Sequence, residues 1–246
     1  MQKWARALYQ PMLPMGKDGR RVTECEEHIR LSKEAAKEGM VLLKNEESIL
    51  PLAKGSKAAL FGKASFDYVK GGGGSGDVTV SYIRNLYEGL KEKSDVLTVF
   101  EELSDFYREN VREQYASGSI PGLTKEPEIP ETLLKKARAF TDTAIIAISR
   151  FSGEGWDRSV ESSGRKLEHV EDKNLYEAAQ KVFERGDFYL SRAEEAMVNT
   201  VKKTFPKVIV VLNVGGMVDS AWFAEDKEIQ SVLMAWQGGM EGGLAA

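Results

Sequence analysis

The fold class is decided by one stretch of the chain, Ala144-Ile145-Ile146-Ala147-Ile148-Ser149-Arg150-Phe151-Ser152-Gly153-Glu154-Gly155-Trp156-Asp157-Arg158. Its first part is continuously apolar and rich in isoleucine, which predicts a short strand of a parallel sheet that is covered on both faces. The chain leaves that strand through a turn in which Gly153 and Gly155 bracket one carboxylate, Glu154. Ligands bind at the edge of open parallel sheets, beyond the carboxyl ends of the strands, so this turn is a candidate site. A surface turn with a solvated glutamate is the alternative interpretation.

Further buried strands alternate with amphipathic helices along the chain. Apolar runs predict strands at 57–62, 96–100, 207–213 and 229–236, and a shorter extended segment at 40–45. Helical patterns lie at 24–38, 78–93, 101–115, 131–140, 191–204 and 217–223. Ser191 followed by Glu194 has the spacing of a capping box. This alternation predicts an α/β fold, a layered α/β/α sandwich around a largely parallel sheet.

The two ends of the chain and one internal stretch depart from this alternation. Residues 1–23 carry prolines and glycines among charged residues, and they predict an irregular arm ahead of a sandwich domain at 24–246. Residues 159–186 are highly charged and predict a helical insertion on the surface. The last predicted helix opens in the glycine-rich 238–246 and the chain stops inside it. The sandwich is therefore expected to be truncated at its C-terminus.

Composition limits the classes of function. A formal net charge of -4 disfavours a nucleic-acid surface, which needs a concentrated basic face. With one cysteine and two histidines the chain has little material for a metal centre, and we expect no metal and no cofactor. No apolar run approaches the roughly 20 residues of a membrane helix, and the first residues lack the apolar core of a signal peptide. A soluble cytoplasmic protein is expected, without nucleic-acid or membrane partners.

Three glycine-containing segments come after buried strands, at 71–77, 153–158 and 213–220. If the strands are parallel, these segments gather at one edge of the sheet. That edge would hold the hydroxyl of Ser75, the carboxylate of Glu154, and an ion pair of Asp157 with Arg158. Such a set suits hydrogen bonding to a polyhydroxylated ligand.

The glycine-rich run at 71–76 is open to other interpretations. It lacks the Lys-Ser/Thr that ends a P-loop, and it lies too far beyond its strand for a dinucleotide fingerprint. A flexible surface loop stays a serious alternative. Among the tryptophans, Trp156 is the candidate for stacking on a sugar, whereas the apolar surroundings of Trp222 and Trp236 predict core positions.

Five motifs stand in order along the chain: Glu38-Gly39-Met40-Val41-Leu42-Leu43-Lys44-Asn45 with Leu50-Pro51-Leu52, Gly72-Gly73-Gly74-Ser75-Gly76, Ser152-Gly153-Glu154-Gly155-Trp156-Asp157-Arg158, Val210-Val211-Leu212-Asn213-Val214-Gly215, and Ala235-Trp236-Gln237-Gly238-Gly239-Met240-Glu241-Gly242-Gly243. Each motif alone is weakly specific. Together, over residues 24–246, they resemble the α/β-sandwich domain of glycoside hydrolase family three, the β-glucosidase family.

The resemblance implies a retaining β-glycosidase that hydrolyses terminal β-D-glucosyl residues through a covalent glycosyl-enzyme. The sandwich domain would supply the general acid/base, Glu154. An aspartate nucleophile would come from a (β/α)8 barrel that this chain lacks. The residues expected to bind substrate are Ser75, Gly74, Gly76, Trp156, Asp157 and Arg158.

Without a barrel, the chain is expected to be an inactive fragment of a family member with reversed order, in which the sandwich precedes the barrel. Its partners would be a β-glucoside or oligosaccharide substrate and that barrel. The charged stretch leaves Glu161, Glu168 and Glu171 as rival acid/base candidates. A noncatalytic carbohydrate-binding α/β domain is the alternative function.

Overall fold

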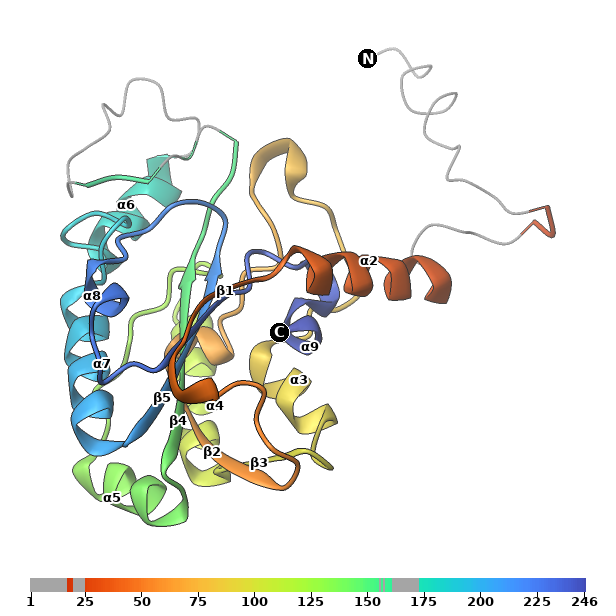
Figure 1. The fold of residues 1–246 in the computed structure, drawn as a ribbon. Helices are drawn as coiled ribbons and strands as arrows, with labels where there is room; N and C mark the ends of the chain where they lie inside the picture. Colours follow the sequence, from red (N-terminus) through yellow and green to blue (C-terminus); the bar gives the residue numbers. More distant parts are fainter. Residues whose placement is uncertain (1–16, 20–24, 155, 157, 161–172) are drawn as a thin grey trace.

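A six-stranded sheet forms the centre of the computed structural model, which describes residues 17–19, 25–154, 156, 158–160 and 173–246 (Figure 1). Its strands are β1 (Val41–Asn45), β2 (Ser56–Phe61), β3 (Leu97–Val99), β4 (Thr143–Arg150), β5 (Lys207–Val214) and β6 (Ser231–Met234). They lie in the order β1-β6-β5-β4-β2-β3. All neighbours are parallel except β1, which pairs antiparallel with β6. The largely parallel sheet predicted from the sequence is confirmed.

The two central strands carry the core. β4 and β5 pair in continuous register from Thr143 opposite Lys207 to Arg150 opposite Val214. Alternate side chains enter two separate apolar cores. Ile146 and Ile148 lie in the core on one face of the sheet, and Ile145 lies in the core on the other face. Because side chains in a strand alternate between faces, a strand covered on both sides is apolar at almost every position. The apolar runs of β4 and β5 can therefore be recognised as strands from the sequence.

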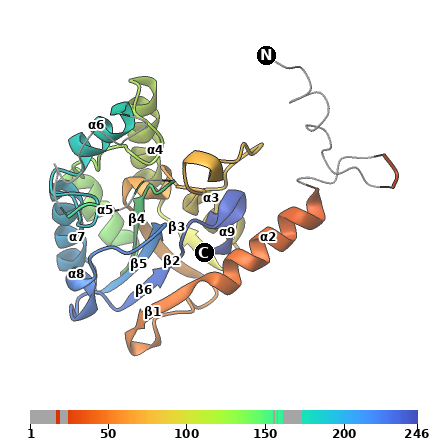
Figure 2. The same cartoon turned by 90° about the horizontal axis from the view of Figure 1, so that it is seen from above.

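Helices cover both faces of the sheet, which confirms the layered α/β/α architecture. One face is covered by α4 (Glu101–Ala116), α5 (Glu131–Phe140), α7 (Arg192–Thr204) and the short α8 (Ala221–Ala224). The other face carries α3 (Leu86–Glu92), against which α9 (Gly242–Ala245) packs. α2 (Glu26–Gly39) has no buried residue and continues the line of β1 away from the sheet (Figure 2). α6 (Lys173–Val182) lies beyond the carboxyl end of β4.

Short 3-10 helices shape the connections, and they are η1 (Glu46–Ser48), η2 (Lys63–Ser65), η3 (Gly74–Gly76) and η5 (Gly239–Glu241). The capping box predicted at the start of α7 is present. The Glu194 amide donates to Ser191 Oγ at 3.2 Å, and the Ser191 amide donates to Glu194 Oε2 at 2.8 Å. α7 therefore begins at the position that the sequence indicates.

The helix predicted at 78–93 is wrong in its first half. Helix α3 begins only at Leu86, because Asn85 forms a capping box with Glu88. Upstream, Lys70 Nζ donates to the carbonyl of Val78 at 2.8 Å, and the Val78 side chain is exposed rather than directed to the core. The apolar residues that suggest a long helix therefore do not share a buried face.

Two expectations near the C-terminus also need correction. The helix predicted at 217–223 shrinks to the four residues of α8. Trp222 packs partly buried against the core as expected. Trp236 is 39% exposed, and its indole Nε1 donates to the Gly39 carbonyl at 2.9 Å. Trp236 is therefore an anchor for the end of α2 and not a core residue.

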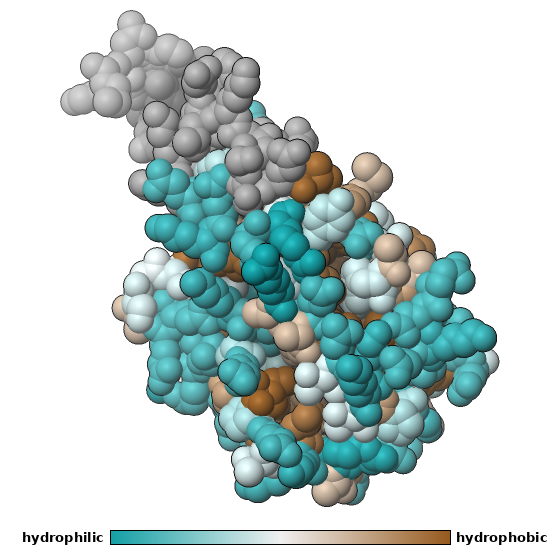
Figure 3. All heavy atoms as spheres, turned by 90° about the vertical axis from the view of Figure 1, so that its left-hand side faces the viewer, coloured by the Kyte–Doolittle hydropathy of each residue, from teal (hydrophilic) through white to brown (hydrophobic). Residues whose placement is uncertain are grey.

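Most of the predicted arm at 1–23 and residues 161–172 of the charged stretch lie outside the described residues. α6 falls within 159–186, and the insertion itself stays a prediction. None of the described helices is long and apolar enough to cross a membrane. The side of the molecule that carries α6, α7 and α8 has a mainly hydrophilic surface, with separate hydrophobic spots (Figure 3).

The close approach of Gly62, directly after β2, to the neighbouring parallel strand β4 yields a stability prediction. This glycine has a φ of 95°, and a Cβ there would lie 2.2 Å from the Ala147 carbonyl oxygen. Gly55 has a similar φ of 82° with nothing within 4 Å of its Cβ position. Gly55→Ala should therefore cost only the strain of a left-handed backbone, about 1–2 kcal/mol. Gly62→Ala should cost clearly more, and urea unfolding of both variants measures the difference. Equal losses would contradict the clash.

Candidate active site

The first two predicted segments meet backbone to backbone at the carboxyl edge of the sheet. The Gly73 amide donates to the Ser152 carbonyl at 2.8 Å, and the Glu154 amide donates to the Gly73 carbonyl at 3.3 Å. A Cβ on Gly153 would lie 2.7 Å from the Gly73 nitrogen. Side chains at these positions would separate the two segments, so the glycines permit the contact. The sequence prediction that the segments gather at one edge is confirmed for this pair.

Glu154 lies over the backbone of Gly74. A Cβ on Gly74 would lie 2.5 Å from Glu154 Cβ and 2.9 Å from Glu154 Oε2, and the φ of Gly74 is 71°. Gly74 is the first residue of the 3-10 turn η3, which continues through Ser75 to Gly76. Glu154 is exposed to solvent. The edge thus presents an exposed glutamate beside the backbone of Gly74.

The third predicted segment ties this edge together through Asn213 at the end of β5. Asn213 Oδ1 accepts from the Val69 amide at 2.7 Å, and its Nδ2 donates to the Val69 carbonyl at 2.9 Å and the Trp236 carbonyl at 2.7 Å. Ser152 Oγ also meets Gln237 Oε1 at 3.0 Å. The chain that follows β6 therefore joins the same edge, a contribution that the sequence analysis did not identify.

Arg158 pairs with Asp187, and the ion pair predicted between Asp157 and Arg158 stays a prediction, because Asp157 lies outside the described residues. Arg158 Nη1 lies 2.8 Å from Asp187 Oδ2, and Gly155 is also outside the described residues. Trp156 Nε1 donates to the same Asp187 oxygen at 3.1 Å. The half-buried indole is also in edge contact with Phe151 and Tyr176. Trp156 and Arg158 therefore make protein contacts that hold the turn.

A buried ion pair lies beneath the turn. The guanidinium of Arg150 is 1% exposed and donates to both carboxylate oxygens of Glu194, at 2.8 and 2.7 Å. Its Nε donates to the Asp187 carbonyl at 2.9 Å. Burial alone would raise the pKa of Glu194, but the charge and hydrogen bonds of Arg150 hold that pKa below its usual value. The one sequence signal for this pair was a charged residue at the end of an otherwise buried apolar strand.

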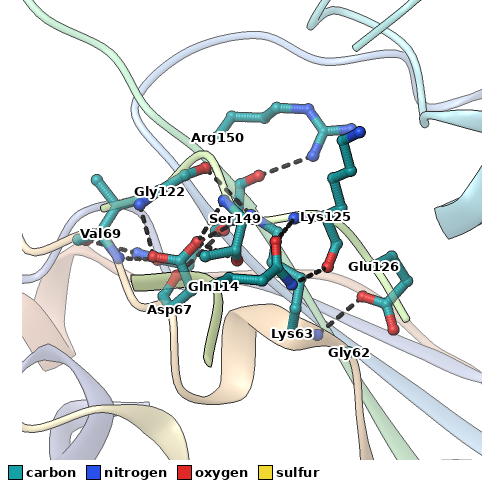
Figure 4. Close-up of polar contacts among 12 residues, drawn as sticks. Gly62, Lys63, Asp67, Val69, Gln114, Gly122, Lys125, Glu126, Ser149 and Arg150 are labelled. Atoms are coloured by element: carbon teal, nitrogen blue, oxygen red, sulfur yellow. Dashed lines mark hydrogen bonds and ion pairs between the residues drawn. The ribbon is translucent and has the colours of Figure 1, made fainter. Parts of the chain in front are cut away.

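A second buried cluster fixes the connection between α4 and α5 (Figure 4). The carboxylate of Asp67 accepts from Thr124 Oγ1 at 2.6 Å and from the Gly122 amide at 2.5 Å, and it lies 3.2 Å from Lys63 Nζ. The Lys63 amide donates to Glu126 Oε2 at 2.8 Å. Among the described residues no group of His, Cys, Asp or Glu is placed to hold a metal ion. These charges therefore serve to fix the loops beside the site.

The family model for the glycosyl hydrolase family 3 C-terminal domain matches residues 40–246. The chain belongs to that family. The resemblance stated from the sequence motifs is thereby confirmed. The match includes every motif quoted above apart from the first two residues of the first one.

Individual proteins similar to this chain are named beta-glucosidases. The chain is 59% identical to beta-glucosidase A of Butyrivibrio fibrisolvens over 246 residues, which is 100% of this chain and 30% of the relative. It is 31% identical to a beta-glucosidase of Ruminococcus albus over 88% of this chain and 21% of the relative. The structure of beta-glucosidase 3B from Thermotoga neapolitana in complex with glucose matches with a TM-score of 0.74 and 33% identity, covering 92% of this chain and 29% of that one. The chain thus spans less than a third of the length of these proteins.

The buried cluster generates a prediction on pH. Burial, with a smaller contribution from the nearby charge of Glu194, raises the pKa of Glu126 to about 8. An unfolded chain loses this proton near pH 4.5, so the folded state binds more protons between these values, and its stability falls as pH rises toward 8. Glu126→Gln cannot ionise. We expect the unfolding equilibrium constant of the native chain to rise relative to that of the variant by up to about tenfold per pH unit across this window.

Urea unfolding of the native chain and Glu126→Gln at pH 5, 6, 7 and 8 measures this difference. Other titrating groups are common to both proteins, so they cancel in the comparison. A gap in unfolding free energy that stays constant over the series would show that Glu126 keeps an ordinary pKa.

Proposed function

We propose that this chain supplies the general acid/base side of a retaining β-glucosidase active site, which releases terminal β-D-glucosyl residues from β-glucosides or oligosaccharides. The position of Glu154 carries the proposal. Its carboxylate lies over the backbone of Gly74 at the ligand-binding edge of the sheet. The names of the relatives, beta-glucosidases of the same family, support this substrate class.

Retaining hydrolysis needs two carboxyl groups about 5–5.5 Å apart. One attacks the anomeric carbon, and the other protonates the departing oxygen and then takes a proton from water when the glycosyl-enzyme is hydrolysed. Glu154 has the second role in our proposal. The nucleophile belongs to a (β/α)8 barrel outside this chain. When the barrel covers the exposed Glu154, loss of solvent raises the pKa of its carboxyl and keeps the proton that the leaving group needs.

The substrate contacts proposed around Glu154 come from the turn η3 and the residues after the glutamate. Ser75 contacts the sugar through its hydroxyl, and Gly74 and Gly76 leave the backbone open for close approach. Asp157 stays a predicted substrate contact. Trp156 and Arg158 support the site by holding the chain after Glu154 through their contacts with Asp187. The chain alone is expected to be inert. Its cytoplasmic location and sandwich-first domain order are parts of the same proposal, which cell fractionation and the sequence of the longer protein test.

The acid/base role is testable in a chimera in which this chain replaces the matching part of the Butyrivibrio fibrisolvens beta-glucosidase A. Glu154→Gln should lower kcat/KM by about 10²–10⁴-fold for a phenyl β-glucoside, whose leaving group needs protonation. It should change kcat/KM far less for a 2,4-dinitrophenyl β-glucoside, whose leaving group departs without a proton. Glu131→Gln is the matched control. Glu131 is exposed at the start of α5, and α5 lies at the opposite end of the sheet from the candidate site.

Azide separates catalysis from binding in the same chimera. With Glu154→Ala, azide should restore turnover of the dinitrophenyl substrate and yield β-glucosyl azide, because the anion attacks the glycosyl-enzyme without needing a general base. A noncatalytic binding role for Glu154 predicts no such rescue. If a variant of Glu161, Glu168 or Glu171, and not of Glu154, loses activity on the phenyl substrate and keeps it on the dinitrophenyl substrate, the acid/base role moves to that residue. A folded but inactive chimera would contradict the proposal.

Gly74→Ala tests the contact between η3 and the glutamate. The new methyl group would collide with Glu154 and displace its carboxylate. We expect kcat of the chimera on the phenyl substrate to fall at least tenfold, because small misplacements of a catalytic group cost large factors in rate. Gly71→Ala is the control, since nothing lies within 4 Å of its Cβ position. Equal activity of the two variants would show that Glu154 acts from another position.

A further inference from the structure

We propose that Asp187 is the positioning residue of this site, which fixes the turn that carries Glu154 by holding the chain that follows it. The inference rests on the acid/base role proposed for Glu154. Asp187 stands 33 positions further along the chain, at the far end of the charged stretch. Its side chain is almost fully buried, at 7% exposure. A buried carboxylate is retained only where several donors satisfy it.

Three donors from four consecutive residues converge on this one carboxylate. Trp156 Nε1 and Arg158 Nη1 reach Oδ2 at 3.1 and 2.8 Å. The Ser159 amide reaches Oδ1 at 2.7 Å. Hydrogen bonds that involve an ionised partner are roughly twice as strong as neutral ones. Asp187 therefore specifies the path of the chain directly after the turn.

Contacts within the turn also hold it: the Trp156 amide donates to the Gly153 carbonyl at 2.9 Å, and Arg158 Nη1 donates to the Phe151 carbonyl. On its upstream side the backbone contact with Gly73 holds Gly153 and Glu154. Glycine follows the glutamate directly, and it brings no side chain to pack and wide conformational freedom. Glu154 thus stands in the chain between the contact with Gly73 and the residues that donate to the Asp187 carboxylate. A change at Asp187 alters the direction of the glutamate without touching a ligand.

Asp187 can act as a fixed point because its own backbone is held. Its carbonyl accepts from Nε of Arg150, and Arg150 is locked by the two-oxygen contact with Glu194 of α7. The Phe188 amide in turn donates to the Ser159 carbonyl at 3.0 Å, so the returning chain closes against the point from which it departed. Through Asp187, Arg150 and Glu194, the position of Glu154 therefore depends on helix α7.

Asp187→Asn removes one charge from a buried group of four charges that balance in the native chain. Two buried guanidinium groups, of Arg150 and Arg158, face two carboxylates, of Glu194 and Asp187. Asparagine can still accept from the Ser159 amide, but its amino group would face two other donors. The substitution leaves Arg158 without its counter-charge and frees the indole of Trp156, while the side-chain volume stays almost the same.

The anchor is measured first in this chain, without any activity. Indole N–H signals in ¹H–¹⁵N spectra report each tryptophan, and Trp156→Phe assigns the one from Trp156. Asp187→Asn should shift or broaden that signal and leave those of Trp222 and Trp236 in place. Asp67→Asn is the control, because it breaks an equally buried carboxylate cluster that has no contact with the turn in the described structure. An unchanged Trp156 signal in Asp187→Asn would overturn the proposal.

The catalytic consequence is measured in the chimera. Asp187→Asn should lower kcat on the phenyl β-glucoside at least tenfold with KM within about twofold, and should spare kcat/KM for the dinitrophenyl substrate. Asp67→Asn should lower the melting temperature and keep the native leaving-group dependence. An equal loss on both substrates in Asp187→Asn would assign it a purely structural role and overturn the inference. If Glu154→Gln has no effect, the proposed function fails, and the indole signal still decides whether Asp187 holds the turn.

Discussion

The burial of one guanidinium group organises this domain. Arg150 ends the central strand β4 at 1% exposure, and a buried cation is tolerated only when it is paired and fully hydrogen-bonded. Its donors reach Glu194 and the carbonyls of Ser149, Asp187 and Tyr189. These partners bring together the start of α7 and the chain that returns from the charged stretch. The demand of one buried charge therefore sets the path of segments that are far apart in sequence.

Close backbone contact is the second constraint, and it operates at the edge where the proposed chemistry occurs. Gly73 and Gly153 meet at distances that exclude a Cβ, and Gly74 leaves room for the Glu154 side chain. Hydrogen bonds between the two segments replace the side-chain packing that glycine does not provide. The glycines give this turn little intrinsic rigidity, so the buried contacts of Trp156 and Arg158 with Asp187 matter for its path.

The sequence predicted the sheet well because β4 and β5 are buried on both faces and hence apolar almost throughout. The edge that carries Glu154 was also predictable, since parallel strands bring their carboxyl ends together. The helix start at Leu86 was missed because a local cap at Asn85 outweighed an apolar pattern that proved to be exposed. Asp187 was missed for another reason. It lies 29 positions beyond Arg158, across the charged stretch, and no local pattern in the sequence indicates the ion pair that the fold forms between them.

On the proposed function, the two properties that an acid/base needs are supplied by different parts of the protein. This chain orients the Glu154 side chain, through the Gly73 contact before it and the Asp187 carboxylate that holds the chain after it. It does not supply desolvation, because Glu154 is exposed in the described structure. A carboxyl in water ionises well below neutral pH and cannot act as an acid there. On this proposal, the barrel that covers the edge therefore has to raise the pKa of Glu154. Glu154 then becomes an effective acid only where the substrate and the nucleophile are also present.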